Sequence, residues 1–199
     1  YQASHEGFLA RGFTDSQAER LLLRAVELVR EALAERGATV SATRLVAASM
    51  GPWGAAQADG SEYRGAYGVD AATLRDFHRR RLQVLDRAGA DLIACETFPD
   101  RAECEVLGEL LGFADTPAWV SFQCADDRHV ADGTPVREMA AMFAERGQED
   151  VILGHRTRDA DADRFLAEAR RIGAEPPGAL QRDLDAAREQ FEKAADLAP

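Results

Sequence analysis

The chain has 199 residues, of which 46% are hydrophobic and 30% are charged, as in a soluble globular protein with one sizeable core. Its formal net charge of −11 argues against a nucleic-acid-binding protein, because phosphate contacts need clustered Lys and Arg. No apolar run approaches the roughly 20 residues that span a bilayer, and no secretory signal opens the chain, so a membrane protein is not expected.

The first predicted helix follows Thr14-Asp-Ser-Gln17, a pattern typical of a capping box. Apolar residues then recur at helical spacing until Gly37. They are Ala18, Leu21, Leu22, Ala25, Leu28, Val29, Ala32 and Leu33.

Residues 44–50 are predicted to form a buried strand, which opens into a long glycine-rich loop. The loop holds Gly51, Pro52, Gly54, Gly60 and Gly65. Such a loop lets backbone and a few polar side chains approach a ligand closely, although a flexible connector is the alternative interpretation.

The second and third helices flank a short apolar strand at residues 91–95, which runs straight into Glu96. Asp70 is expected to cap the second helix, and Asp100 and Glu103 to start the third. The second helix has an apolar stripe through Leu74, Phe77, Leu82, Leu85 and Ala88, and the third has Val106, Leu107, Leu110 and Leu111 inside.

Two further strands are predicted, at residues 118–122 and 150–154, with a fourth helix between them. Thr134 is expected to cap the helix between them, with Pro135 in its first turn. The inner face of this helix is expected to carry Val136, Met139, Met142 and Phe143.

Apolar runs separated by amphipathic helices indicate parallel strands buried on both faces, hence an α/β barrel or an open doubly wound sheet. Both architectures place their sites at the carboxyl ends of strands, where the long loops after residues 50, 96 and 123 lie.

From residue 155 the pattern changes, which divides the chain into residues 1–154 and a charged tail of residues 155–199. Two helices are predicted in the tail, around residues 165–172 and 180–194, with Pro176-Pro-Gly178 between them. Asp159, Asp161 and Asp163 alternate like part of a calcium loop but lack its Gly and Glu, so a solvated charge run is the better interpretation.

The cysteines Cys95, Cys104 and Cys124 are an odd number without a paired short spacing. This favours a reduced, cytoplasmic protein over a disulfide framework. Since Cys95 falls in a predicted strand and Cys104 in a predicted helix, free core thiols are a better interpretation than metal ligands. His78, in the second helix, is expected to be a packed or hydrogen-bonded residue.

Six short motifs stand in order between residue 1 and about residue 150. They are Tyr1-Gln-Ala-Ser4, Ser49-Met-Gly-Pro-Trp-Gly-Ala55, Asp59-Gly-Ser-Glu-Tyr-Arg-Gly65, Glu96-Thr-Phe-Pro99, Ser121-Phe122 and Asp132-Gly-Thr-Pro135. Together they resemble the homocysteine S-methyltransferase family, whose members move a methyl group from S-methylmethionine or S-adenosylmethionine to the sulfur of homocysteine. The resemblance implies a partial (β/α)8 TIM barrel, about strands 3 to 6 with their helices. The helical C-terminal tail of residues 155–199 that follows is not expected to match the family.

The resemblance also implies a set of substrate-binding residues, although no catalytic residue. They are Glu96, Thr97, Gly51, Trp53, Gln2 and Ser121. Glu96 stands where the family's glutamate contacts the amino group of homocysteine. Without this context, Glu96 would be taken for a carboxylate that helps to start the following helix.

The family's zinc thiolates come from one cysteine after the sixth strand and an adjacent cysteine pair near the C-terminus. Here Gly154-His-Arg-Thr157 stands at the first position, and no Cys-Cys pair occurs in the chain. Zinc would turn the substrate thiol into a nucleophilic thiolate, so the chain alone is expected to lack this activating group. His155 could meet a metal there, but the sequence shows no partner ligand.

Three hypotheses about the chain stay open. It is a fragment of an active zinc methyltransferase, an inactive remnant that binds ligands or partners, or an open α/β domain that binds a phosphate or nucleotide. Against the third, no Gly-x-Gly-x-x-Gly or Walker loop follows a strand. Two barrel strands would lie before residue 1 and two after residue 154. The edges at 44–50 and 150–154 are then expected to be unpaired and to promote self-association.

Overall fold

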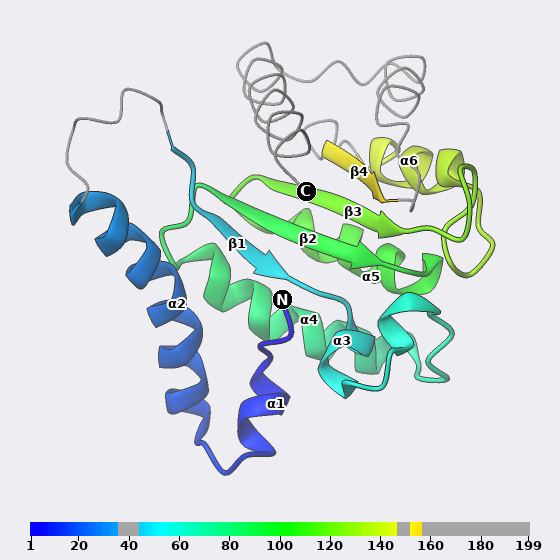
Figure 1. Ribbon diagram of the computed structural model, residues 1–199. Helices are drawn as coiled ribbons and strands as arrows, with labels where there is room; N and C mark the ends of the chain where they lie inside the picture. Colours follow the sequence, from blue (N-terminus) through cyan, green and yellow to red (C-terminus); the bar gives the residue numbers. More distant parts are fainter. Residues whose placement is uncertain (36–43, 147–151, 157–199) are drawn as a thin grey trace, which may run out of the picture.

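The computed structural model describes residues 1–35, 44–146 and 152–156 (Figure 1). Its strands form one parallel sheet in the order β1-β2-β3-β4. They are β1 (Ala47–Met50), β2 (Leu92–Phe98), β3 (Ala118–Gln123) and β4 (Ile152–Arg156). In the described sheet, β1 and β4 are the edges, as the sequence predicted.

The connecting helices are α4 (Ala71–Asp86), α5 (Arg101–Leu111) and α6 (Val136–Ala144). Helix α5 packs between α4 and α6, and Figure 1 shows α4 and α5 behind the sheet. Parallel strands in sequential order, joined by right-handed crossovers, place their helices on one face. A doubly wound sheet would carry helices on both faces, so the described part agrees with a partial barrel-like fold.

Two helices precede β1, namely α1 (His5–Leu9) and α2 (Asp15–Glu35), and α1 packs on both α2 and α4. The loop after β1 contains the short helix α3 (Trp53–Gln57) and a 3₁₀ turn, η1 (Ser61–Tyr63). The sequence did not predict α1, α3 or η1, because each is too short for a periodic pattern. Among the described helices, none combines the length and apolarity that a membrane crossing requires.

Side-chain caps begin three of the helices as predicted. Thr14 and Gln17 exchange hydrogen bonds of 2.8 and 3.3 Å between side chain and backbone. Asp70 accepts the N–H of Thr73 at 2.8 Å at the start of α4. Asp100 accepts the N–H of Glu103 at 2.8 Å at the start of α5.

The predicted cap of the fourth helix is wrong. Pro135 is the N-cap residue of α6 and no side chain caps this helix. Thr134 belongs to the preceding turn, where its N–H donates to Asp132 at 2.7 Å and its carbonyl accepts from Val130 at 2.9 Å. The helix therefore starts one residue later than predicted, with the carbonyl of Pro135 accepting the N–H groups of Glu138 and Met139 at 2.9 and 3.3 Å.

Strand lengths also differ from the prediction. Regular pairing of β1 begins only at Ala47, because the N–H of Val46 donates to the carboxylate of Asp91 at 2.7 Å instead. Strand β2 continues three residues past Cys95 through an irregular step. Two predictions lie outside the described residues. One is the end of the first helix at Gly37. The other is the tail of residues 157–199, with its two helices and the Asp159–Asp163 run.

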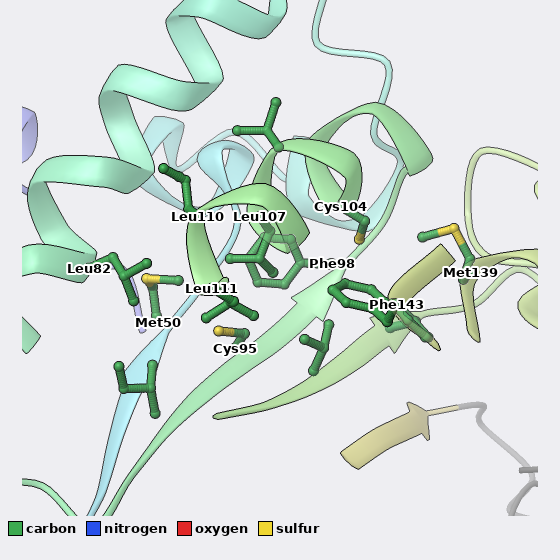
Figure 2. Close-up of a cluster of buried hydrophobic side chains, with 14 of the residues drawn as sticks. Met50, Leu82, Cys95, Phe98, Cys104, Leu107, Leu110, Leu111, Met139 and Phe143 are labelled. Atoms are coloured by element: carbon green, nitrogen blue, oxygen red, sulfur yellow. The ribbon is translucent and has the colours of Figure 1, made fainter. Parts of the chain in front are cut away.

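The core lies between the sheet and its helices, and Figure 2 shows part of it. Met50, Cys95 and Phe98 from the strands meet Leu107 from α5 and Phe143 from α6 there. All three cysteines are buried and none forms a disulfide, which confirms their interpretation as core thiols.

Only part of the apolar pattern of α2 is buried. Ala18 and Leu22 are buried, together with Val26. Leu21, Leu28 and Val29 are exposed, because α1 and α4 pack against the side of this helix that carries Ala18, Leu22 and Val26.

Candidate functional site

The face of the sheet away from α4, α5 and α6 carries the polar side chains. Along β1, Ala48 and Met50 point into the core, whereas Ala47 and Ser49 are exposed. Strand alternation likewise sends Cys95 to the core and Glu96 to the open face. In a barrel this open face is the interior, so Ser49 and Glu96 stand at the mouth of such a barrel.

Ser49 and Glu96 form the centre of the site. The Ser49 hydroxyl donates to Glu96 Oε2 at 2.6 Å, between the carboxyl ends of two adjacent strands. Within the described part of the chain, Glu96 forms no ion pair with a cationic side chain. Its carboxylate is therefore held in place but remains free to accept hydrogen bonds from a cation.

A bulge after Glu96 brings two more predicted residues to this point. The register of β2 against β3 shifts between Cys95 and Phe98, and Thr97 adopts a φ of +70°. This region is unfavourable for a β-branched residue, and such strain concentrates at functional sites. The turned backbone lets the Thr97 N–H donate to Ser121 Oγ at 3.2 Å and returns Phe98 to the core.

The segment before α1 borders the site. The carbonyl of Tyr1 accepts the N–H of Gly51 at 3.1 Å, and a Cβ on Gly51 would lie 2.8 Å from the Tyr1 ring. Gly51 is thus required because the loop and Tyr1 of the same chain approach each other closely at this position. Burial raises the pKa of the Tyr1 phenol, as do the nearby carboxylates of Glu62 and Glu96.

Trp53 and Gln2 are the two remaining predicted residues. The Trp53 N–H donates to Glu103 at 2.5 Å, and its ring packs on Tyr67 with centroids 5.1 Å apart. Trp53 therefore anchors the loop against α5. Gln2 is exposed. For these two, as for the other four, a substrate contact remains a prediction.

Three residues at this point were not predicted individually as site residues, namely Tyr1, Ser49 and Glu62. Glu62 is only 5% exposed, and its Oε2 has no hydrogen-bond partner among the described residues. Ser49 could have been found as the one hydroxyl near the end of an apolar strand. Nothing in the sequence indicates that η1 contacts β2 and brings Glu62 to this point.

The cysteines of the chain do not fit a zinc site. Burial raises the pKa of Cys95 to about 12 and that of Cys104 well above its ordinary value, so both thiols stay protonated. Zinc needs thiolates that converge on one point. Residues 1–35, 44–146 and 152–156 contain no group of three His, Cys, Asp or Glu that could hold a metal.

Comparison with known proteins places these features in a family context. The family model described as homocysteine S-methyltransferase matches residues 1–189. The homocysteine S-methyltransferase of Escherichia coli (strain K12) is 47% identical over 149 residues, covering 72% of this chain and 47% of that protein. Homocysteine S-methyltransferase YbgG of Bacillus subtilis (strain 168) is 43% identical over 155 residues, covering 74% and 49%.

A selenocysteine Se-methyltransferase of Brassica oleracea var. italica is 41% identical over 168 residues, covering 77% of this chain and 48% of that protein. The chain spans about half the length of these curated relatives. Among solved structures, the metallated form of the homocysteine methyltransferase MmuM from Escherichia coli superposes with a TM-score of 0.73 at 45% identity. That match covers 78% of this chain and 55% of the MmuM chain.

Proposed function

The chain belongs to the homocysteine S-methyltransferase family, and on this basis we propose that it forms part of an enzyme that methylates the sulfur of homocysteine. The observation that carries the proposal is the carboxylate of Glu96, fixed by Ser49 on the open face of the sheet. It offers hydrogen-bond acceptors and negative charge to an ammonium group, which homocysteine possesses. S-Methylmethionine or S-adenosylmethionine is the proposed methyl donor.

The reaction is a single methyl transfer. The sulfur lone pair of homocysteine forms a bond to the methyl carbon while the bond from that carbon to the donor's sulfonium sulfur breaks. The donor leaves as a neutral thioether, the thiol proton passes to solvent, and the acceptor becomes methionine. Glu96 orients the acceptor by its ammonium group, and Thr97 and Ser121 shape the wall beside it.

We assign no step of this reaction to a zinc ion on this chain, since its buried cysteines do not fit one. A binding module without catalysis is therefore the second candidate function. Glu96 binds the ammonium group of the ligand in both candidate functions, so only a measurement of methyl transfer distinguishes the enzyme from the binding module.

The experiment is a methionine-formation assay on the full-length protein with zinc, homocysteine and each donor in turn. If catalysis occurs, Glu96→Gln is expected to raise the KM for homocysteine on the order of 10- to 100-fold, because it removes a charge-assisted hydrogen bond. Glu105→Gln, which alters an exposed helical ion pair with Arg101, is the matched control and should change KM little.

Absence of turnover with both donors would contradict the enzymatic proposal. Calorimetric titration of homocysteine would then test the binding module, whose affinity should fall in Glu96→Gln. No binding in either assay would reject both candidates.

A further inference from the structure

Three ionisable side chains lie buried together at the carboxyl ends of β1 and β2, on the helix side of the sheet. Arg81 and His78 come from α4 and Glu103 from α5, and none is more than 1% exposed. Removal of such groups from water is unfavourable unless hydrogen bonds replace the lost hydration. Well-packed apolar residues could fill the same space, so packing alone does not explain them.

Arg81 binds the backbone of two segments that are remote in the sequence. Its Nη1 donates to the carbonyl oxygens of Tyr1 at 3.4 Å and Ala3 at 3.2 Å, and its Nη2 donates to that of Gly51. The guanidinium also lies over the ring of Phe77, with Cζ 4.8 Å from the centroid. One side chain thus joins the segment before α1 to the first residue after β1.

Glu103 holds the loop after β1 at two points. Its Oε1 accepts the N–H of Trp53 at 2.5 Å, and its Oε2 accepts the hydroxyl of Tyr67 at 3.1 Å. Trp53 begins α3, and Tyr67 follows η1. Both ends of the loop are therefore tied to one carboxylate in the first turn of α5.

His78 connects the arginine to the glutamate. Its Nδ1 lies 3.3 Å from Arg81 Nη2, and its Nε2 lies 2.7 Å from Glu103 Oε1. A guanidinium can only donate, so Nδ1 accepts, and Nε2 carries the hydrogen that it donates to Glu103. Burial lowers the pKa of His78, which favours this neutral form.

We propose that Arg81, His78 and Glu103 form a positioning network that fixes residues 1–3 and the loop from Gly51 to Tyr67 beside Glu96, and thereby sets the geometry of substrate binding. The inference rests on the proposed function, because it takes these segments as the border of the homocysteine site. The network acts through backbone groups and through Tyr67, and none of its three members is a catalytic residue.

The test compares Arg81→Lys with Arg79→Lys in the full-length protein. Lysine keeps the charge but cannot reach three carbonyl oxygens in the fork geometry of arginine. Arg81→Lys is expected to raise the KM for homocysteine about tenfold. Arg79 is exposed and pairs only with Asp76 among the described residues, so Arg79→Lys should stay within about twofold. A merely structural role would lower the folded fraction, and hence the apparent kcat, without changing KM.

A second readout does not depend on activity. In protein labelled with 5-fluorotryptophan, the ¹⁹F resonance of Trp53, assigned with Trp53→Phe, reports on the loop. Arg81→Lys should shift or broaden this resonance, and so should Tyr67→Phe, which removes one hydrogen bond and leaves the buried charges paired. Arg79→Lys should leave it unchanged.

The proposal is overturned if folded Arg81→Lys and Tyr67→Phe match Arg79→Lys in both KM and the Trp53 resonance. If Arg81→Lys does not fold, Tyr67→Phe decides by the same criteria. If the wild-type protein transfers no methyl group, the proposed function fails, and the Trp53 resonance alone decides whether the network positions the loop.

Discussion

Gly65 combines a left-handed backbone with a crowded neighbourhood. Its φ is +68°, and a Cβ there would lie 2.8 Å from the Cβ of Asp100. Asp100 in turn accepts the N–H of Ala66 at 3.0 Å and caps α5, so a displaced Asp100 would loosen both segments. The glycine-rich loop was predicted to approach a ligand closely, and at Gly65 the group that it approaches is the carboxylate side chain of Asp100.

Gly65→Ala is therefore expected to lower the free energy of unfolding by about 2–4 kcal/mol, through strain and lost capping together. Gly68 is the matched control, because its φ of +71° is similar but a Cβ would meet nothing within 4 Å. Gly68→Ala should cost only about 1–2 kcal/mol. Urea unfolding of the two variants measures the difference, and equal losses would contradict the role of Asp100.

His78 gives stability a pH dependence. Burial lowers its pKa in the folded state, so the unfolded chain binds more protons below the ordinary histidine pKa of about 6.5. Stability from the neutral imidazole is thus fully present above that pH and is lost as the pH falls, by up to about 1.4 kcal/mol per pH unit.

Unfolding midpoints between pH 8 and 5.5 test this expectation. His78→Gln should be less stable at pH 8 but should lose less stability on acidification than the wild-type protein. His129→Gln, at an exposed position beside Asp126, is the control. A wild-type slope equal to that of His78→Gln would show that His78 titrates alike in both states.

At the scale of elements, helix starts were the most predictable feature, because a cap is a local contact between residues about three apart. Thr14, Asp70 and Asp100 cap as predicted. The cap at Thr134 failed because the first helical hydrogen bonds go to the carbonyl of Pro135, one residue later, whereas the carbonyl of Thr134 accepts the N–H of Val130.

The cap of α4 offers a measurable test of such local contacts. Asp70 is exposed, and its side chain accepts the N–H of Thr73 at 2.8 Å. Asp70→Ala is expected to lower the free energy of unfolding by about 1 kcal/mol, whereas Asp70→Asn should stay within a few tenths because asparagine also caps well. Thermal or urea unfolding compares the two, and an equal loss would mean that charge matters more than the hydrogen bond.

The candidate site was predictable only in part. The motif Glu96-Thr-Phe-Pro99 and the alternation of strands indicate Glu96 from sequence alone. The positive φ of Thr97, the contact of Ser49 with Glu96 and the network of Arg81 and Glu103 all depend on pairing between remote segments. No local pattern records such pairing, so only the structure reveals it.

At the scale of the molecule, the described sheet has two edges, β1 and β4, whose outer hydrogen-bonding groups lack a neighbouring strand in the described part. The 199-residue chain produced alone is therefore expected to self-associate. Sedimentation velocity should show oligomers or larger aggregates, and a monodisperse monomer with cooperative melting would contradict this prediction.

A charge on the edge should reduce the association. Ala47 is exposed on β1, and Ala47→Lys places a cation there, a common protection of natural edge strands. Gln83→Lys adds the same charge on the exposed surface of α4 and serves as the control. Ala47→Lys should raise the monomer fraction more than Gln83→Lys does.

Because all three cysteines are buried, the folded chain is expected to be unreactive toward thiol reagents. Cys95, Cys104 and Cys124 are its whole complement of thiols. In a longer protein that carries this chain, a reagent applied under native conditions would therefore count only cysteines supplied by other segments. The same reagent after denaturation would count three more, so the difference between two mass spectra reports whether this part of the protein was folded.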